Sequence, residues 1–127
     1  MRRRLRLRRS ADFIQLRRRG KRWHHPLILL IVGPNDLEHS QFGFAVSRHF
    51  GKATDRNRMK RILREVVRSR LGQIESGWDC LFVVRRRAKG ASFSELNAAV
   101  SQLLERSGLL ISSSNTLVSN ALDEGLK

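Results

Sequence analysis

The sequence predicts an α+β fold, a sandwich in which helices pack on one sheet, and three patterns lead to this prediction. Short apolar runs at residues 27–32 and 79–85 are typical of strands buried inside a sheet. Apolar and small residues alternate over 41–48, which predicts a third strand with one face of small side chains. Apolar residues at helical spacing over 55–71 predict a long amphipathic helix. With 127 residues, the chain has room for one domain of this kind.

Capping residues delimit the first helix and the long helix. Ser10 is a candidate N-cap for a short helix over 11–19, which Gly20 would end. Thr54 or Asp55 can cap the long helix, and Gly72 is the candidate at its C-terminus.

The rest of the chain is divided by turn and cap signals. Residues 33–36 read Gly-Pro-Asn-Asp, which predicts a turn after the first strand. Ser92 and Glu95 match a capping box that opens a third helix, and Gly108 would close it. We therefore expect a flexible basic arm over 1–9, a folded domain over 10–108 and a disordered tail over 109–127.

The charge balance predicts a polyanionic partner. The chain has 26 Lys and Arg against 11 Asp and Glu, for a net charge of +15. Of these 26 cations, 11 lie in residues 1–22, 9 in 48–70 and 4 in 85–89. Such grouping indicates binding patches, because each phosphate that a patch neutralises releases condensed counterions.

Cysteine content and hydropathy predict the compartment. The single cysteine, Cys80, has no partner for an internal disulfide, as expected in a reducing cytoplasm. The basic N-terminus is followed by an amphipathic stretch and not by the apolar core of a signal peptide. The longest apolar run has six residues, far fewer than the ~20 that span a bilayer. A soluble cytoplasmic protein with no membrane partner is therefore expected.

The start of the long helix breaks a local rule. Residues 56–61, Arg-Asn-Arg-Met-Lys-Arg, place four cations near a helix N-terminus, where each cation costs about 0.3–1 kcal/mol. A phosphate bound there would reverse this penalty, because helix starts present free N–H groups to anions. The face opposite the apolar stripe continues the pattern over ~25 Å, at ~1.5 Å per residue, and carries Asn57, Lys60, Arg61, Arg64 and Arg68.

Several other interpretations of the same residues stay open. The basic face could be merely solvated, or it could be the polar side of a helix that binds a membrane surface or calmodulin. A structural ribosomal protein and a DNA-binding regulator that uses the long helix in a major groove are the competing functions. Phe13 could be a simple core aromatic.

No catalytic or metal-binding pattern is evident. The carboxylates form no pair for acid–base chemistry, and the four histidines lack ligand spacing. Gly51-Lys52 is not part of a phosphate-binding loop, because Val46 stands where the first glycine is needed and Ala53 where a hydroxyl is needed. The sequence predicts a binding protein with no metal site and no small-molecule substrate.

Three motifs together resemble the bacterial ribonuclease P protein family. They are Phe-Gly-Phe-Ala-Val-Ser-Arg at 42–48, Gly-Lys-Ala at 51–53 and Arg-Asn-Arg-Met-Lys-Arg-Ile-Leu-Arg-Glu at 56–65. The segment over 5–13 is also similar to the family's entry into its first helix, so the resemblance covers about residues 5–107. It implies an αβββαβα order with a mixed sheet and a left-handed crossover, against the usual right-handed rule.

The resemblance also implies the sites. The catalytic RNA would contact the long helix and the strand end before it, through Ser47, Arg48, Lys52, Arg56, Asn57, Arg58, Lys60, Arg61, Arg64 and Arg68. A cleft between the first helix and the sheet would hold the 5′ leader of precursor tRNA, and Phe13 matches one of its aromatic residues. Arg17 and Ile31 stand where the family has further aromatics, so charge should count for more than stacking in this chain.

The function implied is that of a subunit of a ribonucleoprotein endonuclease that removes the 5′ leader from precursor tRNA. The partners would be ribonuclease P RNA and precursor tRNA. Catalytic groups and Mg²⁺ would belong to the RNA, whose metal ions would activate water, and the protein alone would bind no cofactor.

Overall fold

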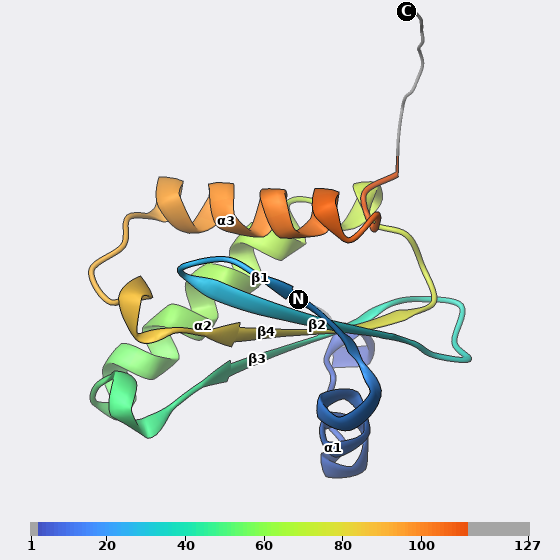
Figure 1. Cartoon of the computed structure of the whole chain (residues 1–127), viewed down its shortest axis with the longest axis horizontal. Coiled ribbons are helices and arrows are strands. Elements are labelled where there is room, and N and C mark those ends of the chain that lie inside the picture. Colours follow the sequence, from blue (N-terminus) through green and yellow to red (C-terminus); the bar gives the residue numbers. More distant parts are fainter. Residues whose placement is uncertain (1–2, 112–127) are drawn as a thin grey trace, which may run out of the picture.

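The computed structural model describes residues 3–111, which form a four-stranded sheet and three α-helices (Figure 1). The elements follow in the αβββαβα order that the resemblance implies. They are α1 (Ser10–Arg19), β1 (Lys21–His24), β2 (Ile28–Pro34), β3 (Gln41–Val46), α2 (Ala53–Arg68), β4 (Trp78–Val84) and α3 (Phe93–Arg106).

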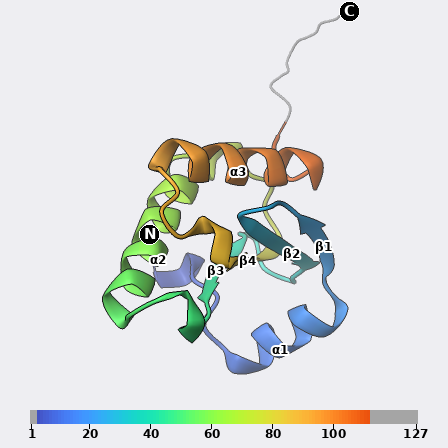
Figure 2. The same cartoon turned by 60° about the vertical axis from the view of Figure 1, so that its left-hand side comes forward.

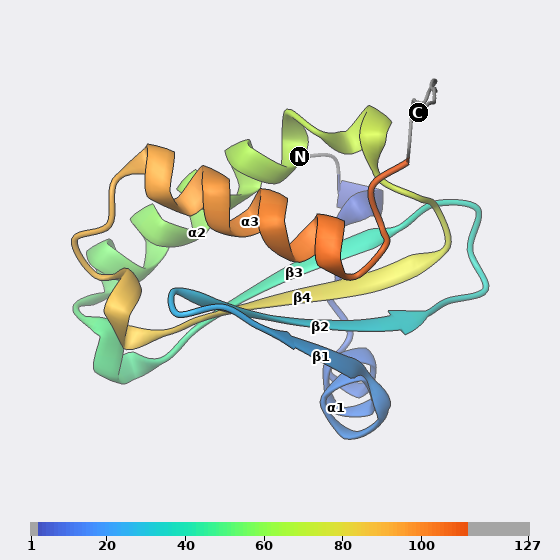
Figure 3. The same cartoon turned by 45° about the horizontal axis from the view of Figure 1, so that its top comes forward.

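The sheet is mixed and has the strand order β1-β2-β4-β3. β2 pairs antiparallel with both β1 and β4, whereas β3 pairs parallel with β4, so α2 is the crossover between two parallel neighbours. The left-handedness of this crossover stays a prediction. α2 and α3 cover one face of the sheet, and α1 lies alone against the other face (Figures 1 and 3).

Strand alternation divides the apolar residues between these two faces. One set, including Leu30 and Phe82, is fully buried beneath α2 and α3. A smaller cluster, made of Leu7, Leu16, Ile31 and Leu81, is buried beneath α1. The helical cover is therefore complete on one face and partial on the other, which leaves room beside α1.

The observed strands differ from the predicted ones at two places. β1 was not predicted as a strand from its residues, because a short run of mostly exposed polar residues at a sheet edge has no hydrophobic pattern. The predicted turn at 33–36 starts too early, since Gly33 and Pro34 still pair with β4. Proline is tolerated there because it ends the strand.

The helix caps agree only in part with the prediction. Ser92 and Glu95 form the expected reciprocal capping box, with N–H···O distances of 3.1 and 2.9 Å. Gly108 follows α3 with φ of +77°, a conformation that favours glycine. The prediction of Gly72 as the C-cap of α2 was wrong, because the helix already ends at Arg68 and Ser69 is its C-cap.

The predicted flexible arm is folded where the structure describes it. Leu7 is 5% exposed, and its N–H donates to the Phe42 carbonyl at 2.9 Å, so residues 3–9 run along the free edge of β3. At the other end Leu109 is buried and Leu110 bridges to Ile74, so the predicted tail cannot begin at 109. The rest of that tail lies outside the described residues.

Candidate RNA interface

The start of α2 is held by Asp55, which lies three residues after the cap position. The backbone N–H of Lys52 donates to the Asp55 carboxylate at 3.1 Å, so the helix begins at Ala53, before the predicted caps. The cations from Arg56 onward therefore lie beyond the first turn, where the effect of the helix dipole has largely decayed. The predicted conflict between charge and dipole is weaker than the sequence suggested.

The outer surface of α2 carries most of the predicted RNA-binding residues. Met59, Leu63, Val66 and Val67 are buried toward the sheet. Asn57, Arg58 and Arg61 are exposed on the outer side, while Lys60 and Arg64 are half-buried at its margin. At 100° per residue, Arg58 projects on the opposite flank from Lys60 and Arg64. We call the surface formed by Asn57, Arg58, Lys60, Arg61 and Arg64 the α2 basic face.

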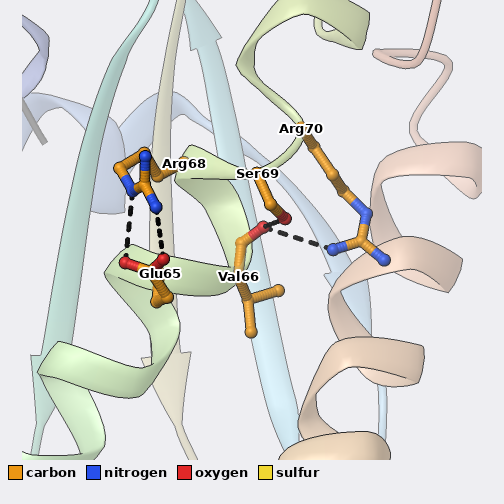
Figure 4. Close-up of polar contacts among 5 residues, drawn as sticks. All are labelled: Glu65, Val66, Arg68, Ser69 and Arg70. Carbon is orange, nitrogen blue, oxygen red and sulfur yellow. Dashed lines mark hydrogen bonds and ion pairs between the residues drawn. The ribbon is translucent and has the colours of Figure 1, made fainter.

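Arg56 and Arg68, at the two ends of this surface, are both engaged within the chain. The Arg56 guanidinium donates to the Gly51 carbonyl at 2.8 Å and fixes the loop before the helix. Arg68 donates twice to the Glu65 carboxylate, at 2.5 and 3.2 Å (Figure 4). The hydrogen bonds from Arg68 lower the pKa of Glu65 below its ordinary value. Arg68 is thus placed on the predicted face, but a neighbour occupies its donors.

Across residues 3–111, the Arg68–Glu65 contact is the one ion pair. The cations of the α2 basic face have no carboxylate partner among these residues, so their charge is free to act on a ligand. Arg70, just beyond the helix, turns away from this pair and donates to the Val66 carbonyl at 3.2 Å (Figure 4). The same nitrogen also donates to the Asn97 side chain of α3 at 2.6 Å.

The segment before α2 adds three of the predicted residues. Ser47, Arg48 and Lys52 are all exposed. The Ser47 hydroxyl accepts from the His49 N–H at 3.1 Å and caps the short 3₁₀ turn Arg48–Phe50. These side chains therefore extend the α2 basic face toward the end of β3.

The predicted leader cleft lies on the face of the sheet that α1 covers only in part. The side chains of Leu29, Val83 and Ala45 form one partly exposed row across β2, β4 and β3. Phe13 of α1 lies over Gly43, where a Cβ atom would come within 3.0 Å of its ring. The glycine thus makes room for the ring, which remains half-buried beside the row.

The structure contradicts the assignment of Ile31 to this cleft. Its side chain is fully buried beneath α1, against Leu16 and Leu81. Leu29, which is two residues earlier on the same face, is the partly exposed residue of that strand. Arg17 is exposed, and its spacing of four residues from Phe13 places it on the same flank of α1. Its part in the cleft stays a prediction.

Arg85 was missed from the sequence as a residue of this cleft. It follows β4 and alternation places it on the face of Val83, one step beyond the row. Its guanidinium donates to His24 Nδ1 at 2.8 Å, and its Nε is buried without a partner among the described residues. A basic residue at the end of the strand predicted over 79–85 is the signal that the sequence offered.

A second groove on the other side of α1 was also missed. It encloses about 870 Å³ between α1 and the loop that joins β2 to β3. Its cationic lining residues are Arg4, Arg6, Arg8, Arg9 and Arg19. The alternation of Arg and Leu over residues 4–8 is a strand-like pattern and could have indicated it.

Within residues 3–111 the structure contains no cluster of three or more His, Cys, Asp or Glu side chains suited to hold a metal ion. Nor do those residues form any helix long and apolar enough to span a membrane.

The chain is similar to proteins of one known family. The family model "Ribonuclease P" matches residues 1–108. The chain is 39% identical over 109 residues to the "Ribonuclease P protein component" of Herpetosiphon aurantiacus, which covers 86% of this chain and 89% of that protein. It is 38% identical over 111 residues to the protein of the same description from Roseiflexus castenholzii, and the match covers 87% of this chain and 91% of that protein.

The fold is also similar to solved structures of RNase P proteins. The RNase P protein from Thermotoga maritima superposes with a TM-score of 0.75 at 32% identity, which covers 80% of this chain and 98% of that one. The Staphylococcus aureus RNase P protein gives a TM-score of 0.79 at 22% identity over 84% and 97% of the two chains, a likeness of fold alone. The chain therefore belongs to the ribonuclease P protein family.

Proposed function

We propose that this chain is the protein subunit of a ribonuclease P ribonucleoprotein, in which it binds the catalytic RNA and the 5′ leader of precursor tRNA. The observation that carries the proposal is the α2 basic face, whose cations have no carboxylate partner among the described residues. A ligand with a regular array of phosphates would satisfy these donors, and arginine suits phosphate because its planar fork makes two parallel hydrogen bonds.

The leader is the proposed ligand of the cleft beside α1. Phe13 offers a half-buried ring for base stacking, and Leu29, Val83 and Ala45 offer an apolar floor. Arg17 and Arg85 supply cations at its margin. A single strand suits such a site because its bases are free to stack.

Cleavage itself is assigned to the RNA subunit in this proposal. The chain supplies affinity and position: α2 holds the catalytic RNA while the cleft holds the leader, so the scissile bond is presented in one geometry. The Mg²⁺ ions that such hydrolysis uses would be held by RNA, and the protein residues would hold none of them.

The test is reconstitution with the purified chain. Precursor tRNA is incubated at low Mg²⁺ concentration with the protein alone, with ribonuclease P RNA alone, and with both. We expect cleavage at the 5′ end of the mature tRNA to be much faster with both than with RNA alone, and absent with protein alone. Cleavage by the protein alone, or no enhancement by it, would contradict the proposal.

A further inference from the structure

We propose that the groove on the other side of α1 is a second binding site for the catalytic RNA, separate from both the α2 basic face and the leader cleft. The proposal rests on the proposed function, and it assigns a ligand to the groove, to which the proposed function gave none. The ligand is a short stretch of the RNA sugar–phosphate backbone.

The groove is positively charged and its cations are free. Five arginines and three aspartates, Asp12, Asp36 and Asp79, line it. No groove arginine forms an ion pair with these carboxylates or with any other within residues 3–111. Five unpaired guanidinium groups around one hollow of about 870 Å³ repel one another, and phosphate oxygens would relieve that repulsion.

The arm that supplies most of these arginines is held in place before any ligand arrives. Leu7 is buried beneath α1, and the Arg4 carbonyl accepts from His39 Nε2 at 3.0 Å and from Gln41 Nε2 at 3.2 Å. Arg6 pairs with Phe42 at the edge of β3. Because the backbone is fixed at these points, the arginines between the leucines are directed to the groove at little further cost in chain entropy.

The mixture of charges in the groove suits RNA. Asp79 is half-buried and accepts from Asn35 Nδ2 at 2.9 Å, which leaves carboxylate oxygen capacity facing the arginines. A ribose 2′-hydroxyl can donate to such an oxygen while the neighbouring phosphate binds arginine. DNA lacks that donor.

The position of the groove favours the catalytic RNA over the leader as its occupant. Leu16 and the body of α1 separate it from Phe13 and Arg17 on the other flank, so the leader cleft does not open into it. The arm instead continues past the edge of β3, where Leu5 lies in a small hollow with Leu71 and Ile74, just after α2. Figure 2 shows α2 and α1 at the two ends of this path. One folded RNA could therefore contact the α2 basic face and the groove together.

The experiment compares two double variants of the full-length chain that lose equal charge. Arg6→Ala with Arg8→Ala removes two groove side chains. Arg18→Ala with Lys21→Ala removes two exposed cations that line neither the groove nor α2. For each protein, Kd is measured for ribonuclease P RNA without substrate across a salt series. The extra affinity that the holoenzyme gains from a leader is measured separately with precursor and mature tRNA.

We expect the groove variant to weaken binding to the catalytic RNA on the order of tenfold more than the control, and to lower the salt slope by about 0.7–0.9 per lost contact. The gain from the leader should not change. Equal Kd values for the two variants would overturn the groove site, as would a loss confined to precursor tRNA, which would make the leader its occupant. If the wild-type chain neither binds the RNA nor enhances cleavage, the proposed function itself fails.

Discussion

Phe13 is the residue on which the two interpretations of the cleft differ most. Its ring packs above Gly43 and contacts the small cluster beneath α1, yet it remains half-buried. A ring in this position can serve as part of the core, as a stacking surface, or as both.

Phe13→Leu separates these roles because leucine keeps the apolar packing and removes the aromatic face. We expect Phe13→Leu and Phe13→Ala both to weaken holoenzyme binding of precursor tRNA by about 1–3 kcal/mol per stacked base. Binding of mature tRNA, measured in the same assay, should change little. If Phe13→Leu retained full affinity for the precursor while Phe13→Ala only lowered stability, the ring would be core alone.

Ile31 is expected to behave as a core residue. Ile31→Val should lower the free energy of unfolding by about 0.5–1.5 kcal/mol, because it removes one methylene from a fully buried site. Urea denaturation measures this change. The ratio of precursor to mature tRNA affinity should stay at the wild-type value, and a fall in that ratio would return Ile31 to the cleft.

The raised pKa of Asp79 predicts that the stability of the fold depends on pH. Burial raises its pKa above the ordinary value, more than the Asn35 hydrogen bond lowers it, and the nearby Asp12 charge raises it further. A raised carboxyl pKa means that the ionised side chain costs stability above the unfolded-state pKa, and that this cost disappears as the pH falls.

Asp79→Asn should therefore be more stable than the wild type at neutral pH, with the difference shrinking toward pH 3. Chemical denaturation at a series of pH values measures it, and Asp36→Asn on the exposed loop is a matched control that should show little change. A difference that grows as the pH falls would contradict the sign.

At the scale of elements, α2 carries the cations that we propose to bind RNA, and its two ends are tied to the chain. Asp55 caps its start, Arg56 holds the preceding loop and Arg68 holds Glu65. The cations between these ends are left for the ligand, so equal charges on one helix should contribute unequally to binding.

Arg61→Ala and Arg68→Ala test this difference with the same change in side chain and charge. We expect Arg61→Ala to weaken binding to ribonuclease P RNA and to lower the salt slope by about 0.9 for the lost phosphate contact. Arg68→Ala should weaken it less, because its donors are shared with Glu65. Equal losses in a titration would show that RNA displaces Glu65 from Arg68.

At the scale of the whole molecule, the two faces of the sheet differ. The face under α2 and α3 is filled by the main core. The face under α1 carries the partly exposed row of Leu29, Val83 and Ala45 on one side of that helix and the groove on the other. Cys80 lies in the main core, fully buried, and burial raises the pKa of its thiol.

Cys80 should therefore report global unfolding. We expect a thiol reagent to label it very slowly in native buffer, and at a rate that rises with denaturant in proportion to the unfolded population. Mass spectrometry of the modified chain measures that rate. Rapid labelling without denaturant would contradict the packing of β4 between β2 and β3.

Local patterns were enough to predict the helices, the three apolar strands and the α2 basic face. Each of these predictions depends only on the spacing of residues within one helix or strand. The period of the apolar residues shows which side of the element is buried, and cations on the opposite side are therefore exposed. The family motifs added the αβββαβα order and the short strand β1, which has no apolar pattern of its own.

The tertiary structure alone decided which residues share a surface. Whether Ile31 lines a cleft depends on where α1 lies over the sheet, and whether Arg68 is free depends on a rotamer shared with Glu65. The arm became part of the fold because β3 had a free edge for Leu7, and this placed its arginines beside α1. Sequence by itself determined that the chain is a basic α+β protein with a charged helix, since composition and periodicity are local properties. The cleft and the groove were decided by packing between distant segments, because a cavity belongs to no single stretch of chain.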